Sequence, residues 1–212
     1  MKFENKGMFG PFTILTCVIT GALFPLLGAL IAVNIGAVQT LYVEGVVLCM
    51  LGGFIAHWLL SHAVHDLIHM KIEERQTVSR RSLKIILVVS AVVLLFIALY
   101  LTWQRGWPVM VFAIIGFIVS MYAEGLIHHE SQMAFGAMFL VLGSFYVQTA
   151  SLELPIVSWL KILMIALFSF FSQYGWLLFY RLDDYNWSIK VKNRSILITK
   201  TGLIFLIIYF FI

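Results

Sequence analysis

The chain has 212 residues, of which 62% are hydrophobic and only 11% are charged, and its mean hydropathy is +1.00. Soluble globular domains have about 45–50% apolar and about 25% charged residues, so this composition excludes a soluble enzyme, a disordered chain and a free nucleic-acid-binding domain. The formal net charge of +4 does not require a nucleic acid or another acidic partner, because the positions of the charges along the chain explain it.

Seven apolar runs follow one another along the chain, and no linker, low-complexity stretch or second domain separates them. A transmembrane helix needs about 20 mostly apolar residues. The runs cover residues 11–33, 38–60, 85–103, 107–122, 133–150, 156–180 and 196–212. The first run is too long for the apolar part of a signal peptide, so we expect it to remain as an anchor. The sequence predicts an all-α fold, a single polytopic membrane helix bundle of about seven transmembrane helices over residues 1–212.

The polar connections predict the orientation of the bundle. Longer loops are expected at residues 61–84 and 181–195, and a shorter one at 123–132. All but two of the 14 lysine and arginine residues lie on the side of the N-terminus, the exceptions being Arg105 and Lys161. Because loops rich in lysine and arginine stay in the cytoplasm, we expect an integral protein of the cell inner (plasma) membrane with a cytoplasmic N-terminus.

The densest group of ionisable side chains follows the second apolar run. If that run continues as a helix, His62, His65, Asp66, His69 and Glu73 share one face about 100° wide. Ionisable groups at membrane depth are costly and are candidates for function. The alternative is a helix that leaves the membrane with its polar face in water, but the lysine and arginine residues come only after this face.

A second group follows the sixth run. Asp183 and Asp184 are succeeded by the basic residues Lys190, Lys192 and Arg194. Oxygen ligands suit Mg²⁺, which proteins usually bind through one or two carboxylates together with substrate phosphates. Two acids followed by basic residues therefore indicate a site for a divalent cation and the phosphates that it bridges. Read alone, this segment is equally typical of a positively charged cytoplasmic loop with incidental acids.

Two further segments have structural interpretations. The polar stretch around His128 and His129 is an interfacial loop, because adjacent histidines on a helix point in different directions. In the fifth run, Gly143 is expected at a helix-packing face, and Gln148 and Thr149 are expected to make interhelical or backbone hydrogen bonds.

In this order, the motifs resemble the UbiA superfamily of intramembrane prenyltransferases, most closely its menaquinone-forming branch. The first aspartate-rich motif of that family is similar to residues 65–69 (HDLIH) followed by Glu73. Its first helix is similar to the start of the first run at residues 11–13 (PFT). Residues 130–136 (ESQMAFG) followed by 142–149 (LGSFYVQT) are the closest match, and Asp184 with the following KNRS at residues 192–195 resembles the second motif.

The resemblance implies transfer of an isoprenyl group from a prenyl diphosphate to an aromatic or other acceptor, with Mg²⁺ held on the diphosphate. It implies catalytic roles for Asp66, His69, Glu73 and Asp184, and metal binding by the same four residues and Asp183. Implied contacts to the diphosphate are His65, Lys71, Asp183, Lys190, Lys192, Arg194, Tyr146 and Gln148. Because imidazole suits softer metals than Mg²⁺, His69 makes Mn²⁺ or another divalent metal an alternative. We expect the main cavity to open between the two motifs.

The sequence also departs from the family pattern. His65 stands in the place of an asparagine, His69 and Ser188 in places of aspartates, and Gly10 in the place of an arginine. Family members usually have further helices after the seventh. Three functions therefore stay open: a prenyltransferase with a divergent metal site, a catalytically silent protein that binds a prenyl lipid or serves as a subunit of a membrane complex, and a transition-metal membrane protein that uses its histidines.

Overall fold

The computed structural model describes residues 8–69, 78–125, 130–182 and 185–212, and over these ranges it is helical with no β-strand. Its seven helices confirm the predicted all-α bundle. The first helix joins α1 (Pro11–Val18) and α2 (Phe24–Asn34) through a π-helical turn (Ile19–Leu23), and the second joins α3 (Val43–Ile55) and α4 (Ser61–His69) through another (Ala56–Leu60). The remaining helices are α5 (Arg80–Arg105), α6 (Pro108–Gly125), α7 (Glu130–Thr149), α8 (Ile156–Tyr180) and α9 (Ile189–Phe211).

The expected polar loops are shorter than predicted. The second span continues as a helix to His69, so residues 61–69 are not a loop, and α9 begins at Ile189, within the expected loop 181–195. The described helices also leave only residues 126–129 between α6 and α7. The prediction of these boundaries was wrong because hydropathy marks the apolar part of a helix, whereas a polar continuation keeps its own backbone hydrogen bonds in water.

Among the described residues, five helical segments are long and apolar enough to cross a membrane by length and composition. They are Thr13–Asn34, Val43–Ile68, Arg80–Arg105, Ile156–Tyr180 and Ile189–Phe211. A shorter apolar helix, Pro108–Val119, lies within α6. α7 packs against α2, α6 and α8, and a helix surrounded by protein needs less hydropathy than one that faces lipid. The chain is therefore built as an integral membrane protein.

Helix starts follow from proline and capping residues. Pro11 and Pro108 occupy the first turns of α1 and α6, where the missing N–H of proline costs no helical hydrogen bond. At the start of α5, the Ser82 N–H donates to the Ser79 hydroxyl oxygen at 3.1 Å. The same helix ends at Gly106, whose φ of +97° is readily adopted only by glycine.

The two helices with π-helical turns cross at close range. Pro25 follows the first π-helical turn and lacks the N–H that would continue the α-helical pattern. A Cβ on Gly21 would lie 2.6 Å from the carbonyl oxygen of Gly53, and one on Gly53 would lie 2.1 Å from the carbonyl oxygen of Gly21. The contact between α3 and the turn Ile19–Leu23 therefore requires glycine on both helices.

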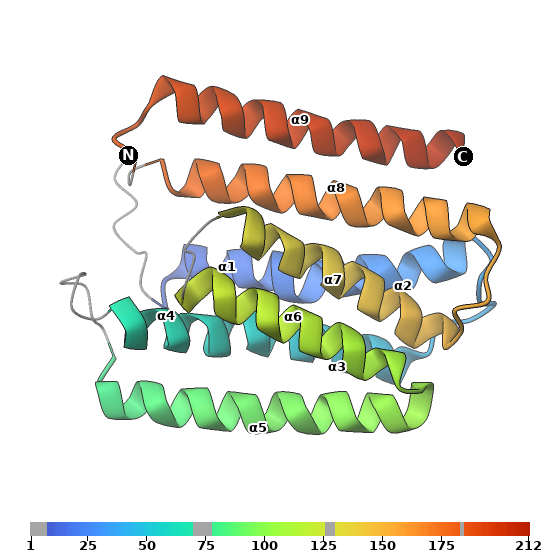
Figure 1. The fold of residues 1–212 in the computed structure, drawn as a ribbon, viewed down its shortest axis with the longest axis horizontal. Coiled ribbons are helices and arrows are strands. Elements are labelled where there is room, and N and C mark those ends of the chain that lie inside the picture. Colours follow the sequence, from blue (N-terminus) through green and yellow to red (C-terminus); the bar gives the residue numbers. More distant parts are fainter. Residues whose placement is uncertain (1–7, 70–77, 126–129, 183–184) are drawn as a thin grey trace.

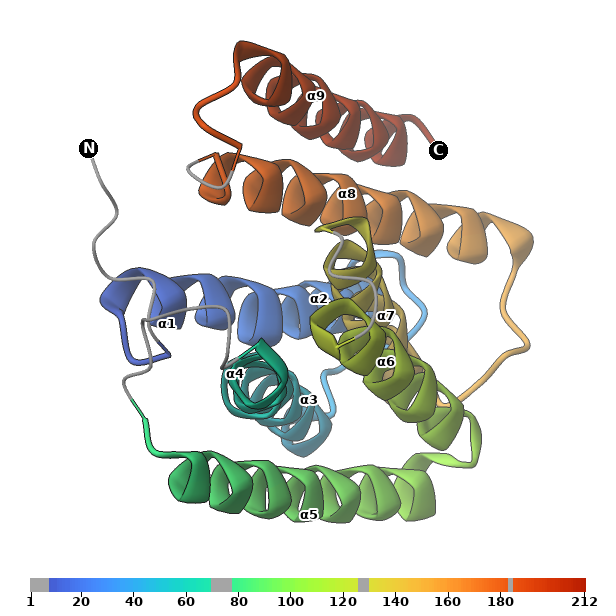
Figure 2. The same ribbon diagram turned by 60° about the vertical axis from the view of Figure 1, so that its left-hand side comes forward.

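The helices alternate in direction, which gives the bundle two distinct ends (Figures 1 and 2). We call the end where α4, α6 and α8 finish and α5, α7 and α9 begin the motif end, because both motifs border it. The connections α2–α3, α5–α6 and α7–α8 lie at the opposite end. In Figure 1, α5 and α9 are on opposite sides of the bundle, and α7 lies between them.

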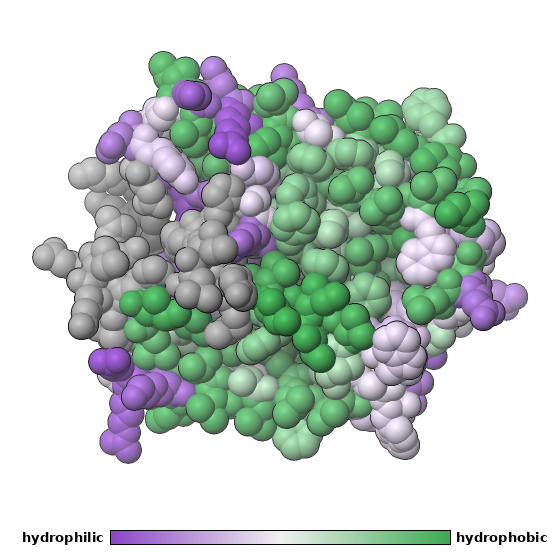
Figure 3. Space-filling model, viewed as in Figure 1, coloured by the Kyte–Doolittle hydropathy of each residue, from purple (hydrophilic) through white to green (hydrophobic). Residues whose placement is uncertain are grey.

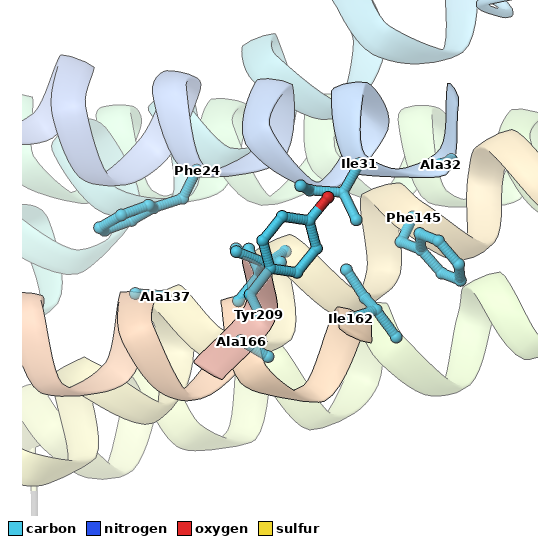
Figure 4. Packing of buried hydrophobic residues seen from close by; sticks show 10 residues of the cluster. Phe24, Ile31, Ala32, Ala137, Phe145, Ile162, Ala166 and Tyr209 are labelled. Carbon is cyan, nitrogen blue, oxygen red and sulfur yellow. The ribbon is translucent and has the colours of Figure 1, made fainter. Parts of the chain in front are cut away.

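The largest buried cluster joins α2, α7, α8 and the end of α9. Phe145 and Ile162 are fully buried in it, and Figure 4 shows Tyr209 of α9 reaching towards α2. The Tyr209 hydroxyl donates a hydrogen bond to the Asn34 side-chain oxygen. This bond gives the hydroxyl of the buried Tyr209 a partner in the exposed side chain of Asn34.

Apolar side chains also dominate the outside of the bundle. The face in Figure 3 carries a broad hydrophobic band, with hydrophilic residues gathered towards its two ends. Phe96 on α5 is 68% exposed and Phe210 on α9 is 75% exposed. Soluble monomers rarely expose contiguous apolar areas of this kind, so the surface agrees with a bilayer as the surrounding medium.

Candidate functional site

The structure contains an apolar cavity of about 420 Å³ inside the bundle. Its walls come from α3 and the turn Ala56–Leu60, and from α5, α6 and α7. Within the part of the chain that the structure describes, none of the lining residues is Asp, Glu, Lys or Arg. Leu95, Ile114 and Phe117 line the cavity and are also exposed on the outside of the bundle. The cavity therefore opens sideways between α5 and α6.

The position of this cavity corrects the expected one. The second span contributes His57, Leu60 and Ser61 to its wall, as predicted, but α8 and α9 contribute no lining residue. This cavity thus meets the expectation only at the second span, and among the described residues it does not extend to the second motif. The physical reason is that α7 lies between the cavity and α8, which it packs against along its length.

The first motif lies on α4 at the motif end. The His65 Nδ1 atom and the Asp66 Oδ1 atom are 3.2 Å apart, and the two side chains are 18% and 26% exposed. The His62 Nδ1 atom lies 3.1 Å from the His57 carbonyl oxygen and can donate to it. The His62 ring thereby gives a hydrogen-bond partner to the His57 carbonyl oxygen, which lies within the π-helical turn Ala56–Leu60, where the regular hydrogen-bond pattern is interrupted.

Several predicted site residues cannot be placed. Lys71, Glu73, Asp183 and Asp184 lie outside the described residues, and so does the side chain of His69. Among the side chains that are described, no three His, Cys, Asp or Glu residues are grouped closely enough to hold a metal ion. The ligand set implied by the resemblance is therefore represented here by Asp66 alone.

The basic residues of the second motif lie on the first turns of α9, also at the motif end. Lys190, Lys192 and Arg194 are exposed. Arg194 donates to the Tyr174 hydroxyl oxygen at 2.7 Å, and its guanidinium carbon lies 5.7 Å from the centre of the Tyr174 ring. Arg194 is thus fixed on α8, while the two lysines project from the surface of the bundle.

A buried carboxylate to which the resemblance assigned no role in the site stands next to this segment. Glu130, at the start of α7, is 2% exposed and accepts hydrogen bonds from Tyr185 at 2.7 Å and Arg181 at 3.4 Å. Burial raises the pKa of the Glu130 carboxyl, but the hydrogen bond from Tyr185, a backbone hydrogen bond, and the charge and hydrogen bond of Arg181 together hold the pKa below its ordinary value. Glu130 therefore ties the start of α7 to the end of α8 and the turn after it. The sequence carries no local signal for this, because the partners are more than 50 residues apart.

Tyr146 and Gln148 correct a further prediction. They were expected to contact the diphosphate, but they lie near the end of α7, at the opposite end of the bundle. Sixteen residues of helix separate Tyr146 from Glu130, which is about 24 Å at 1.5 Å per residue. The prediction assigned residues to one site from their order in the sequence, whereas α7 carries them across the whole bundle.

At the opposite end, these residues belong to a hydrogen-bond network. Gln148 accepts from the Tyr42 backbone N–H at 2.8 Å and donates to the Tyr42 carbonyl oxygen at 3.3 Å. Arg105 donates to the Val147 carbonyl oxygen at 2.7 Å. The Thr149 hydroxyl donates to the Tyr146 carbonyl oxygen at 3.4 Å. The predicted interhelical and backbone hydrogen bonds of Gln148 and Thr149 are confirmed.

The arrangement combines an uncharged chamber within the membrane-spanning helices with charged groups at the motif end. Such a chamber can hold a hydrocarbon chain or a neutral ring, and the motif end can hold anionic groups. Comparisons of the chain with protein-family models, curated proteins and solved structures found no match. The residues and their geometry therefore carry the functional proposal.

Proposed function

We propose that the chain is a UbiA-like prenyltransferase of the cell inner (plasma) membrane, which moves an isoprenyl group from a prenyl diphosphate to an aromatic or other acceptor at the cytoplasmic face. The observation that carries this proposal is the apolar cavity, whose wall continues through Ser61 into α4 with Asp66. Its volume of about 420 Å³ lies within the range of small-molecule sites, about 300–1,000 Å³. An isoprenyl chain can enter from the bilayer through the opening between α5 and α6.

The distribution of charged residues favours different places for the two parts of a prenyl diphosphate, the cavity for the isoprenyl chain and the motif end for the diphosphate. A cavity without charged lining residues disfavours the diphosphate, since an unpaired charge in an apolar medium is strongly destabilised. The exposed Lys190 and Lys192 supply positive charge at the motif end, and we assign them and Lys71 to phosphate contacts.

Asp66 is partly exposed beside His65, and carboxylate oxygens fit Mg²⁺ or Mn²⁺. A bound divalent cation would neutralise charge on the departing diphosphate. Glu73, Asp183 and Asp184 are proposed as its other carboxylate ligands, with His69 as a candidate for Mn²⁺. The role of these residues is to hold the diphosphate at the motif end while the isoprenyl chain lies inside the cavity.

A catalytically silent protein that binds a prenyl lipid is the second candidate. One observation favours it: the Asp66 carboxylate is paired with the His65 ring, where the family pattern has an asparagine. A protonated His65 would compete with a metal cation for the same oxygen. In this case the cavity still binds the isoprenyl chain, and the protein presents it without breaking the bond to the diphosphate.

The test is transfer of a radiolabelled geranylgeranyl diphosphate to hydroxylated naphthalenes, with and without a carboxylate group, by purified protein in lipid nanodiscs with Mg²⁺ or Mn²⁺. We expect metal-dependent transfer by the parent chain and at least a tenfold loss in Asp66→Asn. The control is Glu153→Gln, which removes one negative charge at the exposed opposite end. A second pair of variants tests the cavity. Gly116 has open space at its Cβ position, so Gly116→Leu should fill the cavity and block binding of the prenyl diphosphate. Val111→Leu, on the outer face of α6, is the control and should not affect this binding.

The two candidates give different results. Loss of transfer in Asp66→Asn and Gly116→Leu, with both controls active, supports the prenyltransferase. Binding that Gly116→Leu abolishes, without transfer by any variant, supports the lipid-binding protein. Binding that is unaffected by Gly116→Leu contradicts both functions, because each depends on the cavity.

A further inference from the structure

His57 is an unusual member of the cavity wall. It lies in the π-helical turn Ala56–Leu60, faces a chamber with no charged lining residue and is only partly buried. Among the described residues, the hydrogen bonds of the structure engage its backbone carbonyl through His62 and leave its ring nitrogens unbonded. A neutral imidazole has one N–H donor and one nitrogen acceptor, and polar groups at membrane depth are costly when they lack partners.

The polar lining groups nearest to His57 lie on the same side of the cavity. Ser61 follows one helical turn later towards the motif end, and Thr20 belongs to the other π-helical turn, which contacts the turn that contains His57. The Thr20 hydroxyl donates to the Gln173 side chain at 2.8 Å. At the opposite end of the cavity the lining includes the apolar Leu101, Val109 and Val147. The chamber therefore carries His57, Ser61 and Thr20 towards the motif end, whereas its lining away from that end is mostly apolar, with Cys49 and Ser144 as its polar side chains.

The walls around this polar part suit a flat ring. Phe117 and Phe139 contribute aromatic side chains, and Gly52, Gly53 and Gly136 contribute surfaces without side chains. Aromatic rings pack favourably in offset or edge-to-face arrangements. The cavity is also larger than a single two-ring molecule requires, so its apolar part stays free for a hydrocarbon chain.

We propose that His57 binds the hydroxyl group of a neutral aromatic ring in the polar half of the cavity, with Ser61 beside it. The proposal rests on the proposed function and deepens it, since the ring is then the acceptor and the apolar half holds the isoprenyl chain. His57 supplies the hydrogen-bond partner that a ring hydroxyl needs after it leaves water. The absence of charged lining residues selects a neutral ring over an anionic one.

The test compares two probes of nearly equal size, 1-naphthol and its methyl ether 1-methoxynaphthalene. Their equilibrium binding is measured with radiolabelled probes on protein in phosphatidylcholine nanodiscs, with empty nanodiscs subtracted and with no diphosphate or metal present. We expect the parent chain to bind 1-naphthol at least tenfold more tightly, because the ether cannot donate a hydrogen bond to His57. A tenfold preference corresponds to about 1.4 kcal/mol.

Three variants assign the preference to His57. His57→Phe keeps a ring and removes both nitrogens, so it should bind the two probes equally while its affinity for the ether stays within about twofold. His57→Gln keeps an acceptor and should restore part of the preference. Ser144→Ala removes a buried hydroxyl from another part of the same wall and should leave the preference unchanged.

Several outcomes would overturn the proposal: no binding of either probe by the parent, equal affinity for both probes in the parent, or a preference that survives in His57→Phe. If His57→Phe loses both probes because it misfolds, His57→Gln decides, and equal affinities in that variant count against His57. The measurement omits prenyl diphosphate, so a failure of the transfer assay and a failure of this binding assay remain distinguishable.

Discussion

At the scale of single residues, the structure separates polar side chains that organise the bundle from those available to a ligand. Gln148 and Arg105 bond to backbone groups at the opposite end, and Glu130 bonds to Arg181 and Tyr185 at the motif end. His57 instead faces the cavity. Sequence reasoning grouped polar residues by type and order, whereas their roles depend on what each side chain contacts.

Replacing Glu130 tests whether its hydrogen bonds stabilise the bundle. Glu130→Gln should lower the free energy of unfolding by about 2 kcal/mol, because hydrogen bonds to charged groups contribute about 1.5–3 kcal/mol and Arg181 loses its buried carboxylate. Thermal unfolding in detergent, followed by tryptophan fluorescence, measures the change. Glu153→Gln, at an exposed carboxylate of the opposite end, is the control and should change the stability by less than about 0.5 kcal/mol.

The same carboxyl predicts a pH dependence of stability. Its folded pKa lies below the ordinary value of 4.5, so its contribution is fully present above about pH 4.5 and is lost as the pH falls through the folded pKa. The unfolding temperature of the parent should therefore fall more steeply than that of Glu130→Gln over this acidic range. Parallel pH profiles of the two proteins would exclude a charged, hydrogen-bonded Glu130.

At the scale of helices, the close approach of two neighbouring helices requires glycine at some positions and not at others. A Cβ on Gly28 of α2 would lie 2.2 Å from the Val141 carbonyl oxygen of α7, whereas a Cβ on Gly116 of α6 would have no neighbour within 4 Å. The sequence shows both residues as glycines in apolar helices. Only the packing of neighbouring helices shows that one is required and the other is not.

This difference predicts opposite effects of one substitution. Gly28→Ala should destabilise the protein by about 1–3 kcal/mol, because the added methyl group overpacks the contact between α2 and α7. Gly116→Ala should stabilise it by up to about 1 kcal/mol, since alanine has the higher helix propensity. Unfolding temperatures of the two variants and the parent check both signs, and equal effects would contradict the described contact of α2 with α7.

At the scale of the whole molecule, the alternating helices place both motifs at one end of the bundle. α4 and the first turns of α9 border the motif end, and the turn at Glu153 lies at the opposite end. The excess of lysine and arginine predicts that the motif end is cytoplasmic. Diphosphates are cytoplasmic metabolites in the proposed reaction, so the function requires this orientation.

Labelling of single cysteines in whole cells tests the orientation. Ser79→Cys, exposed next to the start of α5, should react with a membrane-impermeant maleimide only after the membrane is permeabilised. Glu153→Cys, exposed before α8, should react in intact cells. The parent chain, with Cys17 buried and Cys49 partly buried, controls for background. Reaction of Ser79→Cys in intact cells would place the first motif outside and contradict the proposed function.

The sequence by itself determined the class of fold and the run of seven helices, because the number and length of apolar segments follow directly from the cost of unpaired backbone groups in a bilayer. It also placed Asp66 and the basic residues of α9 correctly near one end, since helix direction alternates along a bundle. The helical continuation to His69 agrees with the shared polar face considered from the sequence, whereas the start of α9 at Ile189 was missed, because its polar first turns have no hydropathy signal.

The tertiary structure alone decided where the cavity lies and which polar residues face it. α7 separates the cavity from α8 and carries Tyr146 and Gln148 to the opposite end, and two π-helical turns bring Thr20 and His57 to one part of the cavity wall. Glu130, Arg181 and Tyr185 meet only because α7 packs against α8. These outcomes depend on contacts between residues far apart in the chain, which no local pattern of polarity encodes.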